Sequence, residues 1–538
     1  MTEPLAADHP REAVLVASGD LRQTANRAGW PAQAELETHL REAFAREGVA
    51  LRRAHLYDQS VEHGFISSQR MGMDVFRTID PDAPLVVAEA VWQYTHHVLA
   101  GLRAHRGPIL TAGNWSGQWP GLVGLLNLNA SMTKAGRRYD SIWSADYRDP
   151  FAQQAIREWL TAGRISHDTS HVRDFDPAVL RGPDAEIGTR LATELRRDKA
   201  ILGVFDEGCM GMYNAIIDDE LLNPAGIYKE RLSQSALYAR MHTVSDGEAR
   251  AALDWLLARG MTFRFGTDDA TELTETQVLE QLKMYVAAVR IAADFGCAAI
   301  GIQYQQGLKD LVPASDLAEG LLNNRERPPV LDPETGTELY AGQPLPHFNE
   351  VDEGCAVDAL ATNRVWTAMA LDPATTLHDV RWGDEYGGQF VWVFEISGAV
   401  PASHLVGGYA GASSERQSPV YFGLGGGTLK GICKPGEVVW SRVFVMGGSL
   451  HVDLGRATSV ELPADETERR WRATSYEWPI MHAVLHGVSR NQMMARHRAN
   501  HIQVAYAPDA ATADRALLAK AAMFHELGLQ VHLCGTAL

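Results

Sequence analysis

The sequence predicts an α/β protein: two N-terminal Rossmann-like domains with parallel sheets, followed by a β-rich, barrel-like C-terminal domain. Strand-like and helix-like segments alternate through the first two thirds of the chain, which is typical of parallel sheets covered by helices on both faces. After about residue 346 the helical pattern gives way to strand-like runs separated by glycines. We therefore expect domains at residues 1–185, 186–345 and 346–538.

Four strand-like runs and the helices between them define the first predicted domain. The strands are expected at residues 13–17, 84–91, 107–114 and 140–146. One helix is expected to begin at Pro31 and to end at Gly48, because its apolar residues recur on one face. Another is bounded by Asp149 as N-cap, Pro150 at the first helical position and Gly163 at the C-terminus. The pattern is that of repeated strand–helix units.

The second predicted domain repeats this pattern after a polar linker at residues 164–185. Residues 199–208 form an apolar strand that ends in two carboxylates, and residues 297–303 form a second strand. Two capping-box signatures, which begin at Ser245 and Thr274, each precede an amphipathic helix.

The last predicted domain should be a β-rich sheet or barrel. Strands are expected at residues 391–396, 441–446 and 449–454, and residues 377–462 show little helical periodicity. One helix-like stretch, residues 478–497, precedes a final strand around residues 501–506.

Composition excludes several classes of function. The 538 residues carry 49 basic and 67 acidic side chains, a net charge of −18 that disfavours nucleic acid and anionic membranes as partners. No apolar run is long enough to span a bilayer. The five cysteines are sparse and include no CxxC pair, which favours free thiols in a reducing compartment. The N-terminus does not read as a signal peptide, so we expect a cytoplasmic protein.

The residues alone leave the site open. Ligands of open α/β sheets bind at the carboxyl ends of strands, which draws attention to Asn114, Asp206 and Glu207, although such residues are often only caps and turns. The segment NEVDEG concentrates acidic residues around Asp352, as a metal site or as an acidic loop. The glycine-rich segment at residues 423–431 lacks a phosphate-loop ending and is better interpreted as a tight turn.

Several segments together resemble the L-fucose isomerase family, within the wider group of L-fucose and L-arabinose isomerases. They follow in family order with similar spacing, from about residue 195 to the end. The segments are DEGCMGMYNAIID, GIQYQQGLKDLVPASDLAEGLLNN, FNEVDEG, GGGTLKG, SVELP, a Trp-Pro pair and ANH.

The resemblance implies a Mn2+ site, with Mg2+ or Co2+ as substitutes. Matched motif by motif, its ligands would be Glu319, Asp352 and His501. Two carboxylates and one imidazole suit such a cation and do not suit a structural zinc site. The same resemblance assigns acid–base catalysis to Glu319 and Asp352.

Six further residues are candidate contacts of a sugar. They are Gln303, Gln305, Asn500, Thr428, Arg22 and Trp92. The two glutamines could instead serve only strand-end hydrogen bonding, and Trp92 could be ordinary core. The resemblance implies hexamers in which Trp92 reaches a neighbouring subunit's sugar. Thr428 stands where the family has a tyrosine that faces substrate, so the specificity at the far end of the sugar should differ.

The implied reaction interconverts an aldose and a ketose of an open-chain sugar that is fucose-like, arabinose-like or another hexose, possibly modified at C6. One carboxylate removes the C2 proton and the other returns a proton to C1, through an ene-diolate whose charge the metal stabilises. The alternatives are a metal-dependent epimerase on the same scaffold and a non-catalytic sugar-binding protein.

Overall fold

The computed structural model describes residues 11–179 and 181–537, so the N-terminal residues 1–10, interpreted above as no signal peptide, lie outside it. The fold is mixed α/β, as the sequence predicts, and the chain separates into two compact units, residues 1–167 and 168–538. The boundary expected near residue 345 lies inside the second unit. Among the described residues, no helix is both long and apolar enough to cross a membrane.

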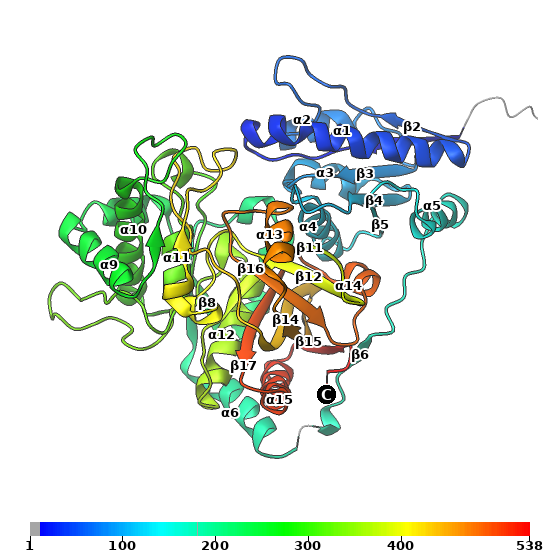
Figure 1. Cartoon of the computed structure of the whole chain (residues 1–538). Helices are drawn as coiled ribbons and strands as arrows, with labels where there is room; N and C mark the ends of the chain where they lie inside the picture. Colours follow the sequence, from blue (N-terminus) through cyan, green and yellow to red (C-terminus); the bar gives the residue numbers. More distant parts are fainter. Residues whose placement is uncertain (1–10, 180, 538) are drawn as a thin grey trace, which may run out of the picture. The chain divides into compact units, whose positions relative to one another are not determined.

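The first unit is built on a five-stranded parallel sheet with the strand order β2-β1-β3-β4-β5 (Figure 1). Its strands are β1 (Arg11–Val16), β2 (Val49–Arg53), β3 (Leu85–Glu89), β4 (Ile109–Asn114) and β5 (Asp140–Ser144). Its helices are α1 (Gln23–Arg46), α2 (Gln69–Phe76), α3 (His96–Ala104), α4 (Gly121–Lys134) and α5 (Pro150–Ala162). The four strands expected from the sequence are confirmed.

Helices cover both faces of this sheet, because each strand buries side chains in both directions. In β1, Leu15 packs with Leu40 of α1 and Trp159 of α5 on one face. Val16 packs with residues of α3 and α4, such as Leu102, on the other. This two-sided burial is what the continuous apolar run predicts.

The predicted ends of α5 are confirmed, whereas the predicted start of α1 is wrong. Asp149 accepts a hydrogen bond from the Ala152 N–H, and Gly163 ends α5 in the left-handed conformation. The first helix begins at Gln23, so Pro31 lies inside it. Proline costs an internal helical hydrogen bond. Tertiary packing offsets that cost, since Trp30 stacks edge-on against Phe65 at 5.3 Å.

The second unit contains a small parallel sheet and a closed ring of antiparallel strands. The parallel sheet has the order β10-β7-β8. Its strands are β7 (Ala200–Phe205), β8 (Ile227–Leu232) and β10 (Cys297–Ile302). The main helices of this part are α6 (Pro183–Asp198), α8 (Gln234–Met241), α9 (Asp246–Ala258) and α10 (Glu275–Asp294). Both capping boxes predicted for α9 and α10 are present.

The ring runs β14-β17-β11-β12-β16-β15 and closes because β15 also pairs with β14. Its strands are β11 (Thr376–Tyr386), β12 (Gln389–Glu395), β14 (Gly436–Met446), β15 (Ser449–Ser459), β16 (Ile480–Leu485) and β17 (His501–Ala507). Every pairing in the ring is antiparallel. No α-helix interrupts residues 377–462, all of which the structure describes, as their lack of helical periodicity predicts.

Three C-terminal or linker expectations are corrected. The predicted linker contains β6 (Val172–Asp174) and the start of α6, and β6 pairs with β18 (Gln530–Cys534). The apolar first part of the helix-like stretch at 478–497 is strand β16, and only α14 (Arg490–Arg496) is helical, because an apolar run buried on both faces does not reveal its period. The strand β17 is not the last, since α15 (Ala510–Glu526) and β18 follow it.

Helix α12 (Glu353–Ala368) packs against β14, β17 and α15 beside the ring (Figure 1). A fully buried polar cluster fastens it there. The Lys520 ammonium of α15 donates to Asp358 and Thr362 of α12 and to Ser441 of β14, the last two at 2.6 Å. Each group in the cluster therefore depends on a partner from another element.

Replacing the lysine should destabilise the chain strongly. Lys520→Met leaves the Asp358 carboxylate buried without its cation, which costs about 3–5 kcal/mol in comparable pairs. We expect a lower urea midpoint for the metal-free protein. The double variant Lys520→Met/Asp358→Asn should recover part of the loss, and an equally low midpoint in both would contradict this account.

Candidate metal centre

Two of the three predicted metal ligands lie together at the junction of α12 and the ring. Asp352 is the N-cap of α12 and accepts a hydrogen bond from the Cys355 N–H at 3.2 Å. His501 is the first residue of β17, which pairs with β11 so that His501 lies opposite Asp379. The start of a helix and the start of a strand thus meet, and both side chains are buried.

The imidazole of His501 is surrounded by carboxylates. Its Nδ1 lies 2.8 Å from Asp352 Oδ2, and its Nε2 lies 3.3 Å from Asp379 Oδ1 and 3.8 Å from Glu350 Oε2. Burial alone would lower the pKa of His501. The contacts with Asp352 and Asp379 outweigh burial and raise that pKa to about 10. In the metal-free protein the ring is therefore an imidazolium at neutral pH.

A second buried cation fixes Asp352. Arg442 of β14 donates to Asp352 Oδ2 at 2.6 Å and to Cys355 Sγ at 2.9 Å. Burial disfavours the carboxylate, but Arg442 and His501 together hold the pKa of Asp352 well below its usual range. Asp352 is consequently ionised, with one oxygen shared by a guanidinium and an imidazole.

The backbone just before Asp352 is strained. Glu350 and Val351 both have positive φ, at 58° and 56°. For a β-branched residue such as Val351 this is an outlier, and such conformations cost about 1–3 kcal/mol each. Because strain of this kind persists only where the surroundings enforce it, the segment is held to aim Asp352 and Glu350 at His501.

Glu319 of α11 (Asp316–Leu322) has a different environment. Ser315 and Asn349 each donate a hydrogen bond to its carboxyl group, and His347 Nδ1 lies 3.7 Å from its Oε2. Burial is the main cause of a strongly raised pKa, and the neighbouring Asp316 and Glu350 raise it further. The surroundings of Glu319 therefore favour its protonated form.

The predicted triad is thus only partly assembled. Within the described part of the chain, the group whose ligand atoms all lie within 4.8 Å of one another comprises Asp352, Cys355 and His501. Glu319 is not in that group. Glu350 lies 3.8 Å from His501 and also raises the pKa of Glu319, so it acts on both of these residues. Burial raises the pKa of the Cys355 thiol well above its usual value, so it is a poor ligand.

Among the predicted sugar contacts, Asn500 is the most informative. It directly precedes His501, is fully buried, and neither its side-chain oxygen nor its nitrogen has a hydrogen-bond partner. Gln303, which follows β10, accepts a hydrogen bond from the Gln305 N–H, and its Nε2 is also buried without a partner. Unsatisfied buried amides are costly and fit a site that binds a polar ligand.

Thr428 is held in place by packing and by one hydrogen bond. The residue is fully buried, its hydroxyl donates to the Glu477 carbonyl at 2.9 Å, and its side chain packs against Gly398. These contacts leave room only for a small side chain, so packing explains why a threonine occupies this position. Its effect on sugar specificity stays a prediction.

Arg22 and Trp92 belong to the first unit and share one edge of its sheet. They follow β1 and β3, which are adjacent, at the point where the strand order reverses and ligands of such sheets commonly bind. Asp20 holds the Arg22 guanidinium through two hydrogen bonds, at 2.9 and 2.6 Å. Trp92 is 6% exposed, and its indole N–H is buried without an acceptor. Both residues can therefore line one ligand site.

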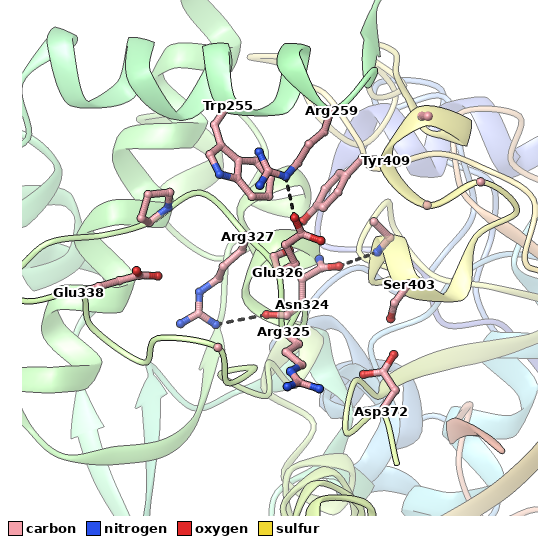
Figure 2. Close-up of a pocket in the computed structure, with 16 residues that line it drawn as sticks. Trp255, Arg259, Asn324, Arg325, Glu326, Arg327, Glu338, Asp372, Ser403 and Tyr409 are labelled. Carbon is pink, nitrogen blue, oxygen red and sulfur yellow. Dashed lines mark hydrogen bonds and ion pairs between the residues drawn. The ribbon is translucent and has the colours of Figure 1, made fainter. Parts of the chain in front are cut away.

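A cavity of about 830 Å3 lies at the C-terminal end of α11 (Figure 2). Asn324 in its wall donates to the Gly320 carbonyl at 2.7 Å, so the wall also caps the helix that carries Glu319. Figure 2 shows Arg259 paired with Glu326 across this cavity, at 2.9 Å. None of the metal-centre residues lines it.

Sequence reasoning missed Asp379 and Arg442. Both lie on ring strands, and only the strand pairing brings Asp379 opposite His501. Glu350 belonged to the acidic segment NEVDEG, but no pattern singled it out. The acidic segment was the one signal for Glu350, and none existed for Asp379 or Arg442, because their role depends on contacts between residues far apart in the chain.

The residues present fit a divalent cation. Asp352, Asp379 and Glu350 place three carboxylates around one imidazole, and the Arg442 guanidinium pairs with Asp352. Oxygen ligands with one histidine nitrogen are suited to Mn2+ or Mg2+. Asp352 and His501 are the candidate central ligands, with Glu350, Asp379 and Glu319 as further candidate carboxyl groups.

Metal binding should displace a proton from His501. The metal needs the neutral imidazole, and a pKa of about 10 means that the ring is protonated at pH 7.5. Mn2+ affinity should therefore rise with pH towards 10, by roughly tenfold per pH unit. Calorimetric titrations in two buffers of different ionisation enthalpy should report about one proton released; a binding heat independent of the buffer would contradict this.

Comparison with known proteins adds no assignment, since neither the family models nor the curated proteins contain a match to this chain. The geometry of the site is therefore the basis for a functional proposal.

Proposed function

We propose that the protein is a metal-dependent aldose–ketose isomerase that acts on an open-chain sugar by proton transfer through an ene-diolate. The observation that carries the proposal is the buried contact between Asp352 and His501, surrounded by further carboxylates and held by Arg442. The unpartnered amide of Asn500 beside this contact supports a polar ligand there.

Two carboxyl groups in opposite protonation states support acid–base catalysis. Asp352 is ionised because two cations contact it, whereas burial and neighbouring acids keep Glu319 protonated. A pair of carboxyl groups whose surroundings move their pKa values apart is the usual arrangement for a base and an acid. We assign Asp352 as the base that removes the C2 proton and Glu319 as the acid that supplies the proton to C1.

The bound cation would stabilise the negative charge of the ene-diolate as a Lewis acid. The protein's own contribution is to exclude water around buried groups and to fix Asp352 through the α12 N-cap and Arg442. Asn500 and Gln303 would hold sugar hydroxyls with their free amide groups.

Other parts of the proposal rest on the family resemblance. They are the choice of Mn2+ with Mg2+ or Co2+ as substitutes, a fucose-like or arabinose-like sugar, and a hexamer. The C6-modified sugar follows from Thr428 in place of the family's tyrosine, and the cytoplasmic location from the sparse cysteines and the N-terminal sequence. Arg22 and Trp92 stay predicted sugar contacts, Trp92 in a neighbouring subunit's site as the resemblance implies, and the sheet edge that they share is a common place for ligands.

The first test is proton exchange at C2 of a panel of aldoses in D2O, with the protein loaded with Mn2+ or treated with chelator. We expect exchange only in the metal-loaded protein. Glu319→Gln removes the acid and keeps the side-chain shape, so turnover should fall by roughly 100- to 10,000-fold. The matched control is Glu334→Gln on an exposed loop, which should leave turnover unchanged.

The products distinguish the alternatives. A ketose product supports the isomerase, and an inverted aldose identifies an epimerase. Metal and sugar binding without exchange on any sugar indicates the non-catalytic binding protein. Full activity in Glu319→Gln, or in metal-free protein, would contradict the proposed mechanism.

A further inference from the structure

A second cavity, of about 600 Å3, lies in the first unit at the amino ends of β4 and β5. This edge of the sheet is opposite the strand ends that carry Arg22 and Trp92. Four arginines line the cavity, namely Arg106, Arg137, Arg138 and Arg164, against a single acidic residue, Asp140. Such a concentration of positive charge is unexpected in a chain with a net charge of −18.

Three of these guanidinium groups form no ion pair within 4.0 Å in the described part of the chain. Arg106 is neutralised by two hydrogen bonds to Asp82. Arg137 donates only to the His105 carbonyl, and its Nε is buried without an acceptor. Arg138 and Arg164 are exposed and have neither a hydrogen bond nor an ion pair with any described residue. The cavity therefore contains several N–H donors without acceptors.

Asp140 brings the unpaired arginines together and does not neutralise them. Its Oδ1 accepts the Ile165 N–H at 2.7 Å, which fixes the segment that carries Arg164. Arg138 and Arg164 both lie close enough to lower the pKa of the Asp140 carboxyl group. The effect of burial is larger, so the pKa of Asp140 is raised. One carboxyl group is thus set against two exposed guanidinium groups, and Arg137 adds a third in the same cavity.

The ends of the neighbouring helices account for only part of this charge. Helices α3, α4 and α5 all end near the cavity, and helix C-termini favour nearby cations. The last turns of α3 and α4 already contain Arg103 and Lys134, whereas that of α5 has no basic residue, so Arg164 stands where it can serve the end of α5. Arg137 and Arg138 are additional. The cavity in Figure 2 differs, because its arginines are accompanied by Glu326, Glu338 and Asp372.

We propose that the cavity between β4 and β5 is a binding site for a small phosphate-bearing anion, with Arg137, Arg138 and Arg164 as its ligands. Guanidinium groups bind phosphate oxygens through paired, charge-assisted hydrogen bonds. A dianion would balance the excess of three guanidiniums over one carboxylate. Free phosphate and a phosphate monoester present the same group, so either could be the occupant.

The test is calorimetric titration of the full-length chain with inorganic phosphate, pyrophosphate and a hexose 6-phosphate. We expect saturable binding, tighter for pyrophosphate than for phosphate. In Arg138→Ala/Arg164→Ala affinity should fall by about tenfold or more, since each charge-assisted contact is worth that factor. Arg70→Ala, on an exposed helical arginine outside the cavity, is the matched control and should bind like the wild type.

A comparison of the affinities for inorganic phosphate and for the hexose 6-phosphate identifies the occupant. Tighter binding of the hexose phosphate than of phosphate indicates a monoester, and the reverse order indicates the free ion. Both substituted arginines are exposed, so the double variant should keep the wild-type unfolding midpoint. The proposal is overturned if phosphate and pyrophosphate do not bind at millimolar concentration. It is also overturned if the double variant binds as the wild type does, or if the arginines prove to mediate association of two chains instead.

Discussion

The buried ion pair between Arg442 and Asp352 is the interaction on which the candidate site depends. It joins a strand of the ring to the N-cap of α12, so the same carboxylate caps a helix, compensates a guanidinium and contacts His501. Taking two charges out of water is costly unless each finds a partner of good geometry. Several hydrogen bonds to the Asp352 carboxylate offset this cost and fix its orientation.

The strain at Glu350 and Val351 belongs to the same arrangement. A left-handed valine would relax in an unconstrained loop, but the N-cap that follows and the packing of Phe348 against Gly301 hold both ends of this segment. The protein thus spends part of its stability on aiming acidic groups at one imidazole. The Lys520 cluster one turn further along α12 keeps the helix from yielding to that strain.

Local signals predicted most of the fold. The caps of α5, α9 and α10 were predicted to the residue, because a cap is a short-range pattern of side chain and backbone. The start of α1 and the strand β16 were mispredicted, since tertiary packing decided both. Of the site residues, Asp352 and His501 were predicted from the motif resemblance. Asp379 and Arg442 could not have been found, because strand register alone brings them to the site.

The pairing of β6 with β18 has a consequence for biosynthesis. Strand β6 is the first strand of the second unit and β18 is the last strand of the chain, and they lie side by side in the extension of the ring. Everything between β6 and β18 must therefore leave the ribosome before this sheet can be completed, whereas the first unit can fold as soon as it emerges. During that interval β6 has an unpaired edge. Production of this protein should accordingly be sensitive to chaperone supply and to translation rate, and loss of β18 should leave the sheet of the second unit incomplete.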